Sequence, residues 1–420
     1  AWAFYRGACA AAAFCAKSQT ESMNTDDVVV TGLGVVSGLG KDLSAFCDGL
    51  FSGRSGIGPL SLFSCPDARS QLVAQAPDPD LSRILLPGCT SRPDRFGIAA
   101  ALAAVEHAGL STPDLRDAAV LFGTGTGGAI ETEQYLRELQ DGMLPSPKLL
   151  VTHQPASVTD LVARILCAYG PRTTVMTACS SSAIAIAQAL DWIRLGRCDV
   201  ALTGGAEALC KLTVAGFGAL RATSPEPCQP FDKNRKGLNL GEGAAVLVLE
   251  SRRHAERRGA KVLARLLGAG MSCDAHHMTA PQPEGIGARQ AMEAALCDAK
   301  VGREAIGYIN AHGTGTPHND AAESRAVRDL LGDRAPHVPM SSIKSMCGHT
   351  LGAAGAIEAA ASVLSLVHGV LPPTKNLREP EIEFGLDYIP EVPRQKQVDV
   401  VLSSSFAFGG NNAALLFGRA

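Results

Sequence analysis

The sequence has little of what marks nucleic-acid-binding or membrane-spanning chains. Charged residues make up only 19% of its 420 residues, and the formal net charge is −3. Without a basic excess the chain cannot neutralise a phosphate backbone, so nucleic acid is not an expected partner. No apolar run approaches the roughly 18 residues of a membrane span, so we expect no span. Hydrophobic residues, at 46%, suffice for a large core, which excludes a disordered chain.

Cysteine spacing excludes a second group of functions. The thirteen cysteines are odd in number and form no C-x-x-C pair, which argues against a disulfide framework, a zinc ribbon or a redox dithiol. We therefore expect no metal site, and thiols that mostly act as small buried hydrophobes in a reducing, cytoplasmic compartment. Residues 1–22 are Ala-rich and precede Met23. We interpret them as a leader or an appended extension outside the fold, with a targeting segment as the alternative.

From residue 27 onward, β-branched or apolar runs alternate with Ala-rich helical stretches. This alternation predicts an α/β fold with buried sheets. The predicted strands are 28–31, 118–122, 173–177, 200–203, 244–249, 308–311 and 400–403, and the predicted helices are 96–108, 157–167, 183–195, 286–298, 321–331 and 353–367. The basic stretch 251–259 is interpreted as a solvated helix linking two halves, with a docking surface for an acidic partner as the alternative.

Residues 123–128 formally match the G-x-G-x-x-G pattern of a dinucleotide site. Such a site needs a second strand that ends in an acidic residue about 20 residues further on. Residues 131–141 are instead polar and helical and lead into a Pro-rich turn. We therefore do not predict a nicotinamide or flavin site.

Residues 173–195 indicate a β-branched strand, a small-residue turn and an amphipathic helix, with Cys179 in the turn. A thiol at such an elbow would be exposed, the helix N-terminus would lower its pKa, and nearby backbone N–H groups could hold an oxyanion. From this segment alone, a buried cysteine beside a run of capping serines is an equally good interpretation.

Two histidines lie in predicted loops elsewhere. His312 follows the predicted strand 308–311, and His349 precedes the predicted helix 353–367. Because loops at strand ends carry the chemistry of α/β proteins, we expect both imidazoles to meet Cys179. A thiolate with two imidazoles suits acyl transfer followed by charge development on an enolate. A papain-like hydrolase places its histidine roughly 130–150 residues after its cysteine, and the spacing of Cys179 and His312 falls in this range. However, the C-G-S-C-W context of that family is missing, and His349 is left unexplained.

At these residues the chain resembles the β-ketoacyl-acyl-carrier-protein synthases of the thiolase superfamily, of the elongating type shared by fatty-acid and polyketide systems. The matching motifs follow the family's order from about residue 27 to the C-terminus, and their combination is highly specific. They are T-A-C-S-S at 177–181, G-G-A-E at 204–207, P-F-D at 230–232 with Arg235, G-E-G at 241–243, N-A-H-G-T-G-T at 310–316, K-S-M-C-G-H at 344–349 and F-A-F-G-G-N-N at 406–412.

The resemblance implies a thiolase-like five-layer α-β-α-β-α fold of two similar halves, with 23–258 carrying the nucleophile and 259–420 the two histidines. It also implies a homodimer, or a heterodimer with a related ketosynthase-like subunit. The implied reaction condenses an enzyme-bound acyl group with malonyl-acyl carrier protein, with loss of CO2, in fatty-acid or polyketide and polyene elongation. Substrates would arrive on the 4'-phosphopantetheine arm of acyl carrier protein, and no bound cofactor is implied.

The resemblance also implies roles for single residues. Cys179 matches the acylated nucleophile, and His312 and His349 match the pair that promotes decarboxylation and stabilises the enolate. Lys344 matches a lysine behind the histidines, and a purely structural ion network around it is the alternative. The candidate ionic partners of Lys344 are Glu323, Asp320 and Glu358.

Further residues are implied to line the path of the substrates. Phe408 matches a gating phenylalanine whose backbone N–H forms the oxyanion hole with that of Cys179. Thr126 falls in the implied acyl pocket, where the fatty-acid enzymes often carry a bulkier residue. The residues implied to contact the phosphopantetheine arm or its entrance are Thr314, Thr316 and Phe217. An acidic carrier protein would need a basic landing patch, for which two sets are candidates: Arg252, Arg253, Arg257, Arg258 and Lys261, or Lys211, Lys233, Arg235 and Lys236.

The sequence departs from the fatty-acid enzymes near the gate. Ala407 replaces a usual glycine, Asn411 replaces a usual threonine, and the serine run 180–182 is more typical of polyketide-type synthases. We therefore hypothesise an acyl chain that is not plainly saturated, such as an unsaturated, polyene or aryl-primed chain. A thiolase proper would carry a second cysteine near the C-terminus, where this chain has Phe408-Gly-Gly. A chain-length-factor-like partner subunit, the non-enzyme alternative, typically lacks the nucleophile.

Overall fold

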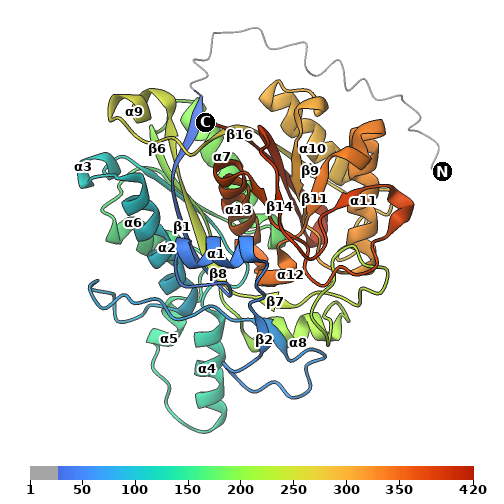
Figure 1. Cartoon of the computed structure of the whole chain (residues 1–420). Coiled ribbons are helices and arrows are strands. Elements are labelled where there is room, and N and C mark those ends of the chain that lie inside the picture. The colour runs from blue at the N-terminus through green and yellow to red at the C-terminus, as the bar shows by residue number, and fades with distance from the viewer. Residues whose placement is uncertain (1–26) are drawn as a thin grey trace, which may run out of the picture.

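The same strand order occurs twice in the computed structural model, which describes residues 27–420 (Figure 1). Each half contains five strands, which lie side by side in the order 3-2-4-5-1 when they are numbered by their order in the chain. The three strands at the start of this order are parallel to one another, and each of the other two is antiparallel to its neighbours. The predicted extension 1–22 lies outside the described residues. The strands of the first half are β1 (Val28–Ser37), β4 (Ala119–Gly123), β5 (Arg172–Val175), β6 (Val200–Glu207) and β8 (Gly243–Ser251), and those of the second are β9 (Ala264–Cys273), β10 (Tyr308–Asn310), β11 (Pro339–Ser341), β15 (Val400–Phe406) and β16 (Asn411–Arg419).

The two halves join into one eleven-stranded sheet. Residues 28–30 of β1 pair antiparallel with residues 264–266 of β9. The short strand β13 (Asp387–Tyr388) adds to β11 and forms one edge of the sheet, and β5 forms the other. Within residues 27–420, β5 pairs only with β4, so its outer edge has no strand beside it.

Helices form three layers around the two halves of the sheet (Figure 1). The middle layer packs between the halves, and the outer layers cover the remaining face of each half. This arrangement confirms the predicted α/β fold of five layers. The middle helices are α7 (Ser181–Arg194) and α13 (Ala354–His368), the outer helices of the first half are α2 (Arg92–Ala108) and α6 (Ser157–Ile165), and those of the second are α10 (Ile286–Ala299) and α11 (Pro317–Leu331).

Helix α2 illustrates how local sequence sets helix boundaries. Ser91 and Asp94 form a reciprocal capping box at its start, and Pro93 lies in its first turn. The helix ends at Gly109, which adopts the left-handed conformation with φ of 64°. Its Ala-rich face packs on β1 and β8, and it therefore holds the first half of the sheet from outside.

Small residues let the two middle helices approach closely. A Cβ atom on Gly355 of α13 would lie 2.7 Å from the backbone nitrogen of Ala183 in α7, closer than real Cβ contacts allow. Because α7 begins just after Cys179 and α13 just after His349, this close approach brings the two loops together.

Residues 351–368 correct one expectation. This stretch is long and apolar enough to cross a membrane by length and composition, whereas we expected no such run. However, 89% of it is buried inside the protein, and Glu358 within it pairs with Lys344. It is therefore the core helix of the middle layer.

All seven predicted strands are strands in the structure, but β9 and β16 are not predicted. β9 contains two glycines, and β16 begins with Asn411 and Asn412. Both residue types are typical of turns rather than strands. Here the two strands lie at the centre of the sheet, paired with each other and with β1 and β15.

The remaining elements are short and lie around this frame. They are α1 (Leu43–Ser52), β2 (Ile57–Pro59), β3 (Leu72–Ala74), α3 (Thr112–Leu115), α4 (Ala129–Gln140), α5 (Lys148–Val151), α8 (Lys211–Ala219), β7 (Leu240–Gly241), α9 (Arg252–Arg257), α12 (Lys344–Cys347), β12 (Val370–Leu371) and β14 (Arg394–Gln395).

Candidate active site

Cys179 lies at the turn between β5 and α7, as predicted. Its neighbour Ala178 has a φ of +53°, which a residue with a side chain rarely adopts, so the elbow is strained. The serine run holds this elbow: the Oγ of Ser181 accepts from the N–H of Thr177 at 2.9 Å and donates to the carbonyl of Ala178 at 2.6 Å. The serines therefore shape the turn that presents the thiol.

The Cys179 thiol is buried, not exposed as the elbow interpretation predicted, with only 4% of the residue accessible. Burial raises its pKa to about 12, although the charge of Lys344 and a hydrogen bond from the backbone N–H of Phe408 act to lower it. The expected lowering of the pKa by the helix N-terminus is thus outweighed by desolvation. Cys179 is therefore a protonated thiol at rest, which must lose its proton in order to react.

This protonation state predicts the pH dependence of alkylation. Because the pKa of Cys179 is raised, the rate of its modification by iodoacetamide is expected to rise about tenfold per pH unit, without a plateau, from pH 6 to 9. Peptide mapping by mass spectrometry would follow Cys179 alone, with the exposed Cys167 of the same sample as the internal reference. A plateau below pH 8 would contradict the raised pKa.

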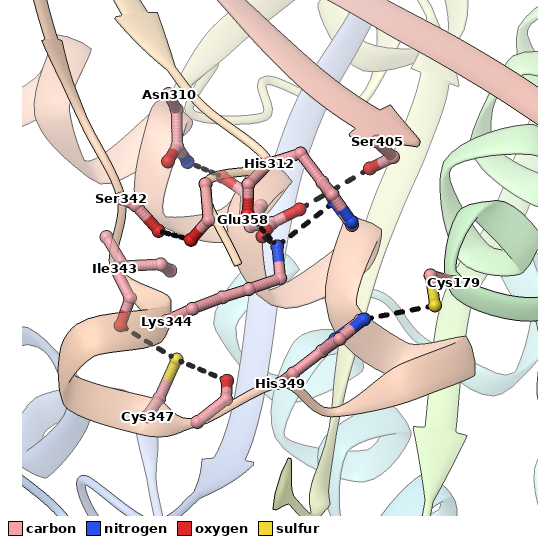
Figure 2. Close-up of polar contacts among 12 residues, drawn as sticks. Cys179, Asn310, His312, Ser342, Ile343, Lys344, Cys347, His349, Glu358 and Ser405 are labelled. Atoms are coloured by element: carbon pink, nitrogen blue, oxygen red, sulfur yellow. Dashed lines mark hydrogen bonds and ion pairs between the residues drawn. The ribbon is translucent and has the colours of Figure 1, made fainter. Parts of the chain in front are cut away.

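His349 contacts the nucleophile directly. Its Nε2 lies 3.0 Å from the Sγ of Cys179 (Figure 2). Its Nδ1 accepts from the N–H of Leu351 at 3.3 Å, so the proton resides on Nε2 and points at the sulfur. Burial and the charge of Lys344 hold the pKa of His349 well below its usual value. The imidazole is therefore a neutral hydrogen-bond donor.

His312 faces the same space from the loop after β10. Its ring is nearly perpendicular to that of His349, with the ring centroids 5.3 Å apart. The Nζ of Lys344 lies 3.2 Å from the Nδ1 of His312 and donates to its carbonyl at 2.6 Å. A cation donating to Nδ1 places the remaining ring proton on Nε2. Burial, together with Lys344 and His349, holds the pKa of His312 well below its usual value.

Glu358 is the direct ionic partner of Lys344 (Figure 2), with both side chains buried. The other two predicted partners bind backbone groups instead. Glu323 accepts from the N–H groups of His312 and Gly313 at 2.8 and 2.7 Å and so fixes the histidine loop. Burial raises the pKa of Glu358 to about 7 and that of Glu323 to about 8.

Asp320 also differs from its prediction. It accepts from the backbone N–H of Phe231 at 2.8 Å and lies 3.8 Å from Arg235. Arg235 in turn pairs with Glu381 at 2.8 Å and donates to the carbonyl of Pro317 at 2.9 Å. This cluster braces the start of α11 rather than contacting Lys344.

Phe408 lies beside the sulfur of Cys179, as the family resemblance implied. Its backbone N–H hydrogen-bonds Cys179, and its ring stacks on Phe217 with centroids 5.5 Å apart. The backbone after Phe408 is anchored, because the N–H of Gly409 donates to the carbonyl of Met278 at 2.7 Å. A peptide N–H at the sulfur is positioned to receive an oxyanion formed on an acyl group there.

A cavity of about 470 Å³ connects these groups to solvent. Cys179, His312 and His349 lie along it, together with all three residues predicted to contact the carrier arm or its entrance, Thr314, Thr316 and Phe217. Three cationic residues, Arg69, Arg221 and Lys236, also line it. The structure thus places a thiol, two neutral imidazoles and a backbone N–H donor along one cavity with basic side chains in its wall, which we call the catalytic channel.

Family matches cover most of the chain. Residues 25–255 match the beta-ketoacyl synthase N-terminal domain, and residues 263–378 match the beta-ketoacyl synthase C-terminal domain. The chain belongs to the β-ketoacyl synthase family. It is a condensing enzyme, an acyltransferase of fatty-acid or polyketide chain elongation, as the motifs predicted.

This synthase has full-length relatives. It is 39% identical over 404 residues to the 3-oxoacyl-[acyl-carrier-protein] synthase 2 of Synechocystis sp., which covers 93% of this chain and 97% of that protein. The solved ishigamide ketosynthase/chain length factor superposes with a TM-score of 0.91 at 39% identity, covering 94% of this chain and 100% of that one. A type II polyketide ketosynthase solved with its acyl-carrier protein, AntDE:AntF, superposes with a TM-score of 0.87 at 30% identity, covering 94% and 100%.

The residue predicted for the acyl pocket of the synthase binds a buried carboxylate, and its place in that pocket stays a prediction. Thr126 does not line the cavity at Cys179; its hydroxyl and its N–H both bond to Glu207. Glu207, which the sequence analysis quoted without a role, also accepts from the N–H groups of Gly125 at 2.6 Å and Gly352 at 3.0 Å. It thereby ties the first half to the second beside the nucleophile. A glutamate ending a buried strand was the only sequence signal for this role.

The two candidate landing patches are also separated by the fold. α9 follows the C-terminal end of β8, which runs antiparallel to β6, so α9 lies at the opposite end of the sheet from the catalytic loops. Its Arg258 pairs with the buried Glu250, and Arg252 pairs with Asp27 at 3.2 Å. Of the second set, Lys236 lines the channel, whereas Arg235 is buried.

Proposed function

We propose that this chain is the catalytic subunit, which joins an acyl group held on Cys179 to the carbanion of a malonyl group carried by acyl carrier protein. The observation that carries this proposal is the 3.0 Å contact between Cys179 Sγ and His349 Nε2, with His312 facing the same cavity. Both imidazoles are uncharged donors, which is the form that an enolate oxygen needs.

The first half-reaction is a thioester exchange. The sulfur of Cys179, which accepts a hydrogen bond from the Nε2–H of His349, attacks the carbonyl of an acyl thioester on the carrier. This hydrogen bond favours loss of the thiol proton, and the developing oxyanion accepts from the N–H of Phe408. The carbon–sulfur bond to the carrier arm breaks, and the proton of Cys179 leaves on the carrier thiol. The products are acyl-Cys179 and the free carrier, so no oxidant or reductant takes part.

The second half-reaction uses the histidines. A malonyl thioester enters, its carbon–carbon bond to the carboxylate breaks, and CO2 leaves. The electron pair remains as an enolate, whose oxygen accepts from the Nε2–H groups of His312 and His349. Its carbon then attacks acyl-Cys179, the carbon–sulfur bond to Cys179 breaks, and the thiolate takes up one proton from solvent water. The β-ketoacyl product remains on the carrier arm. Thr314 and Thr316 are proposed to contact that arm.

Intact-mass spectrometry tests the proposal. The protein would be incubated with carrier-bound acyl thioesters and then with the malonyl thioester on the same carrier. One acyl adduct, lost again on addition of the malonyl thioester, is expected. No adduct from any primer, with the protein folded, would favour the chain-length-factor-like alternative. The same panel tests the chain type, because a saturated medium chain reacting best would contradict the proposed unsaturated, polyene or aryl-primed chain.

The carrier is proposed to land at the cavity mouth. Arg69, Arg221 and Lys236 lie there, whereas α9 lies at the other end of the sheet. Changing Arg221 and Lys236 to glutamate is expected to raise the KM for an acyl carrier by roughly tenfold or more, since an acidic partner is then repelled. The KM for a small acyl-pantetheine thioester should change much less.

Arg252→Glu on α9 is the matched control, because it reverses a charge of the rejected patch. If the KM for the acyl carrier rises in Arg252→Glu but not when Arg221 and Lys236 are changed, the carrier lands at α9 instead. Carrier docking at a ketosynthase is the arrangement described for AntDE:AntF, which supports the proposed partner.

The free edge of β5 supports a paired assembly. β5 leads directly to the nucleophile, and Met176 beyond it is 60% exposed. We propose that a second copy of this chain packs at this edge, with a related ketosynthase-like subunit as the alternative, as in the ishigamide ketosynthase/chain length factor. Native mass spectrometry of the purified chain alone would separate the two. Cys179, Cys228 and Cys347, all buried, are free thiols, which supports a reducing, cytoplasmic location.

A further inference from the structure

Asn239 is a buried polar residue that the proposed reaction does not use. It lies immediately before β7 and has no solvent-accessible surface. A buried carboxamide needs hydrogen-bond partners for its oxygen and its nitrogen. Its partners connect the wall of the catalytic channel to the loop that carries His349.

The side chain of Asn239 closes the loop formed by residues 224–228. Its Oδ1 accepts from the N–H of Cys228 at 2.7 Å. Its Nδ2 donates to the carbonyls of Ser224 at 3.0 Å and Glu226 at 3.2 Å. These backbone groups have no strand or helix of their own, so the carboxamide takes the place of secondary structure in this loop.

The backbone of the same residue holds His349. The N–H of His349 donates to the carbonyl of Asn239 at 2.8 Å, and the carbonyl of His349 accepts from the N–H of Gly241 at 2.9 Å. Leu240 and His349 accordingly form a parallel β-bridge. The peptide of His349 is thus held on both sides by the strand that Asn239 begins.

We propose that Asn239 is a positioning residue, whose carboxamide fixes the strand that sets the distance from His349 Nε2 to Cys179 Sγ. β7 is paired with β3 on its other side, so the carboxamide fixes the strand on the side of the 224–228 loop. A catalytic group needs to be held to within about 0.5 Å. The inference rests on the proposed role of His349. It adds that this role depends on a side chain with no direct contact to the imidazole.

The test is a double-mutant cycle on Cys179 acylation, followed by intact mass in a single turnover and normalised to the folded fraction. Asn239→Ala is expected to slow acylation by about tenfold or more, because the hydrogen bond from His349 to the sulfur is lost. In a His349→Ala background the same substitution is expected to cause no further slowing, since the group it positions is absent. A merely structural residue would slow both backgrounds by the same factor.

Asn376→Gly is the matched control. The Nδ2 of Asn376 donates to the carbonyl of Cys228 at 3.0 Å, so it holds the same loop from the other side without touching the strand at His349. Its φ of +64° suits glycine, so the change removes the side chain without backbone strain. Acylation by this variant should stay within twofold of the parent.

Two outcomes would overturn the inference: equal factors in both backgrounds, or acylation by Asn239→Ala within twofold of the parent. If Asn239→Ala does not fold, Asn239→Asp takes its place in the cycle, because it keeps the size and one acceptor for Cys228. If His349→Ala alone leaves acylation and malonyl decarboxylation unchanged, the proposed role of His349 is wrong. The single variant of the cycle shows this result independently of any effect of Asn239→Ala.

Discussion

Cys179→Ala is expected to lose its acyl adduct and to lower condensation by at least about 10⁴-fold, the scale seen when a catalytic nucleophile is removed. At the same time malonyl decarboxylation is expected to persist. The reason is that His312 and His349 receive their tautomers from Lys344 and the N–H of Leu351, and neither depends on the thiol. Release of CO2 from malonyl carrier protein and intact mass would be measured on the same sample.

Cys198→Ala is the matched control for this experiment. Cys198 is also buried, and burial also raises its pKa, to about 11, but it lies before β6 at the end of the sheet away from the catalytic loops. Its acylation and condensation should stay at the parent level. If Cys179→Ala still formed one acyl adduct, the nucleophile would have to be sought among the other thiols.

Lys344→Met is expected to give the second large effect, on stability and activity together. Removing the cation leaves Glu358 buried without its partner, and breaking such a pair costs about 3–5 kcal/mol. His312 also loses the donor that sets its tautomer, so condensation is expected to fall by at least about 100-fold. Denaturant unfolding and steady-state rates would measure the two effects.

The pH dependence of this loss has a definite sign. The pKa of Glu358 is already raised to about 7 in the folded state, above the usual value for an exposed glutamate. A carboxyl with a raised folded-state pKa contributes most stability below its unfolded pKa and loses it as the pH rises through the folded pKa. Without Lys344 that pKa rises further. The destabilisation should therefore be larger at pH 8 than at pH 5.5.

A double variant separates catalysis from structure at this pair. Lys344→Met with Glu358→Leu removes both buried charges, and such replacements are often neutral or stabilising. Stability is expected to recover while condensation stays low, because His312 still lacks its donor. Recovery of both would favour the alternative in which the lysine belongs to a purely structural ion network.

Much of the site could be predicted from local sequence. Three features of the site are set by residues that neighbour one another in the chain. They are the elbow at Cys179, the strand end before His312 and the helix start after His349. The serine run also has a local explanation, since the hydroxyl of Ser181 bonds to Thr177 and Ala178, both within four residues of it. Such features depend on hydrogen bonds over three or four residues, which sequence patterns describe well.

Other features depend on distant packing. The pKa of Cys179 is raised because both halves of the fold exclude water from it, an effect that outweighs the local helix N-terminus. β9 and β16 contain turn-forming residues yet lie at the centre of the sheet, because their neighbouring strands supply the pairing.

The sequence by itself determined the fold class and the family, and it predicted the three groups that the structure brings together, because each rests on short motifs in a fixed order. Only the tertiary structure decided which carboxylate meets Lys344, where Thr126 lies and which basic patch borders the channel. Glu323, Asp320 and Glu358 are chemically alike, so only their positions in space could separate them. Likewise, α9 and Lys236 differ in position relative to the catalytic loops because antiparallel pairing of β6 with β8 places α9 at the far end of the sheet, whereas Lys236 lines the cavity at Cys179.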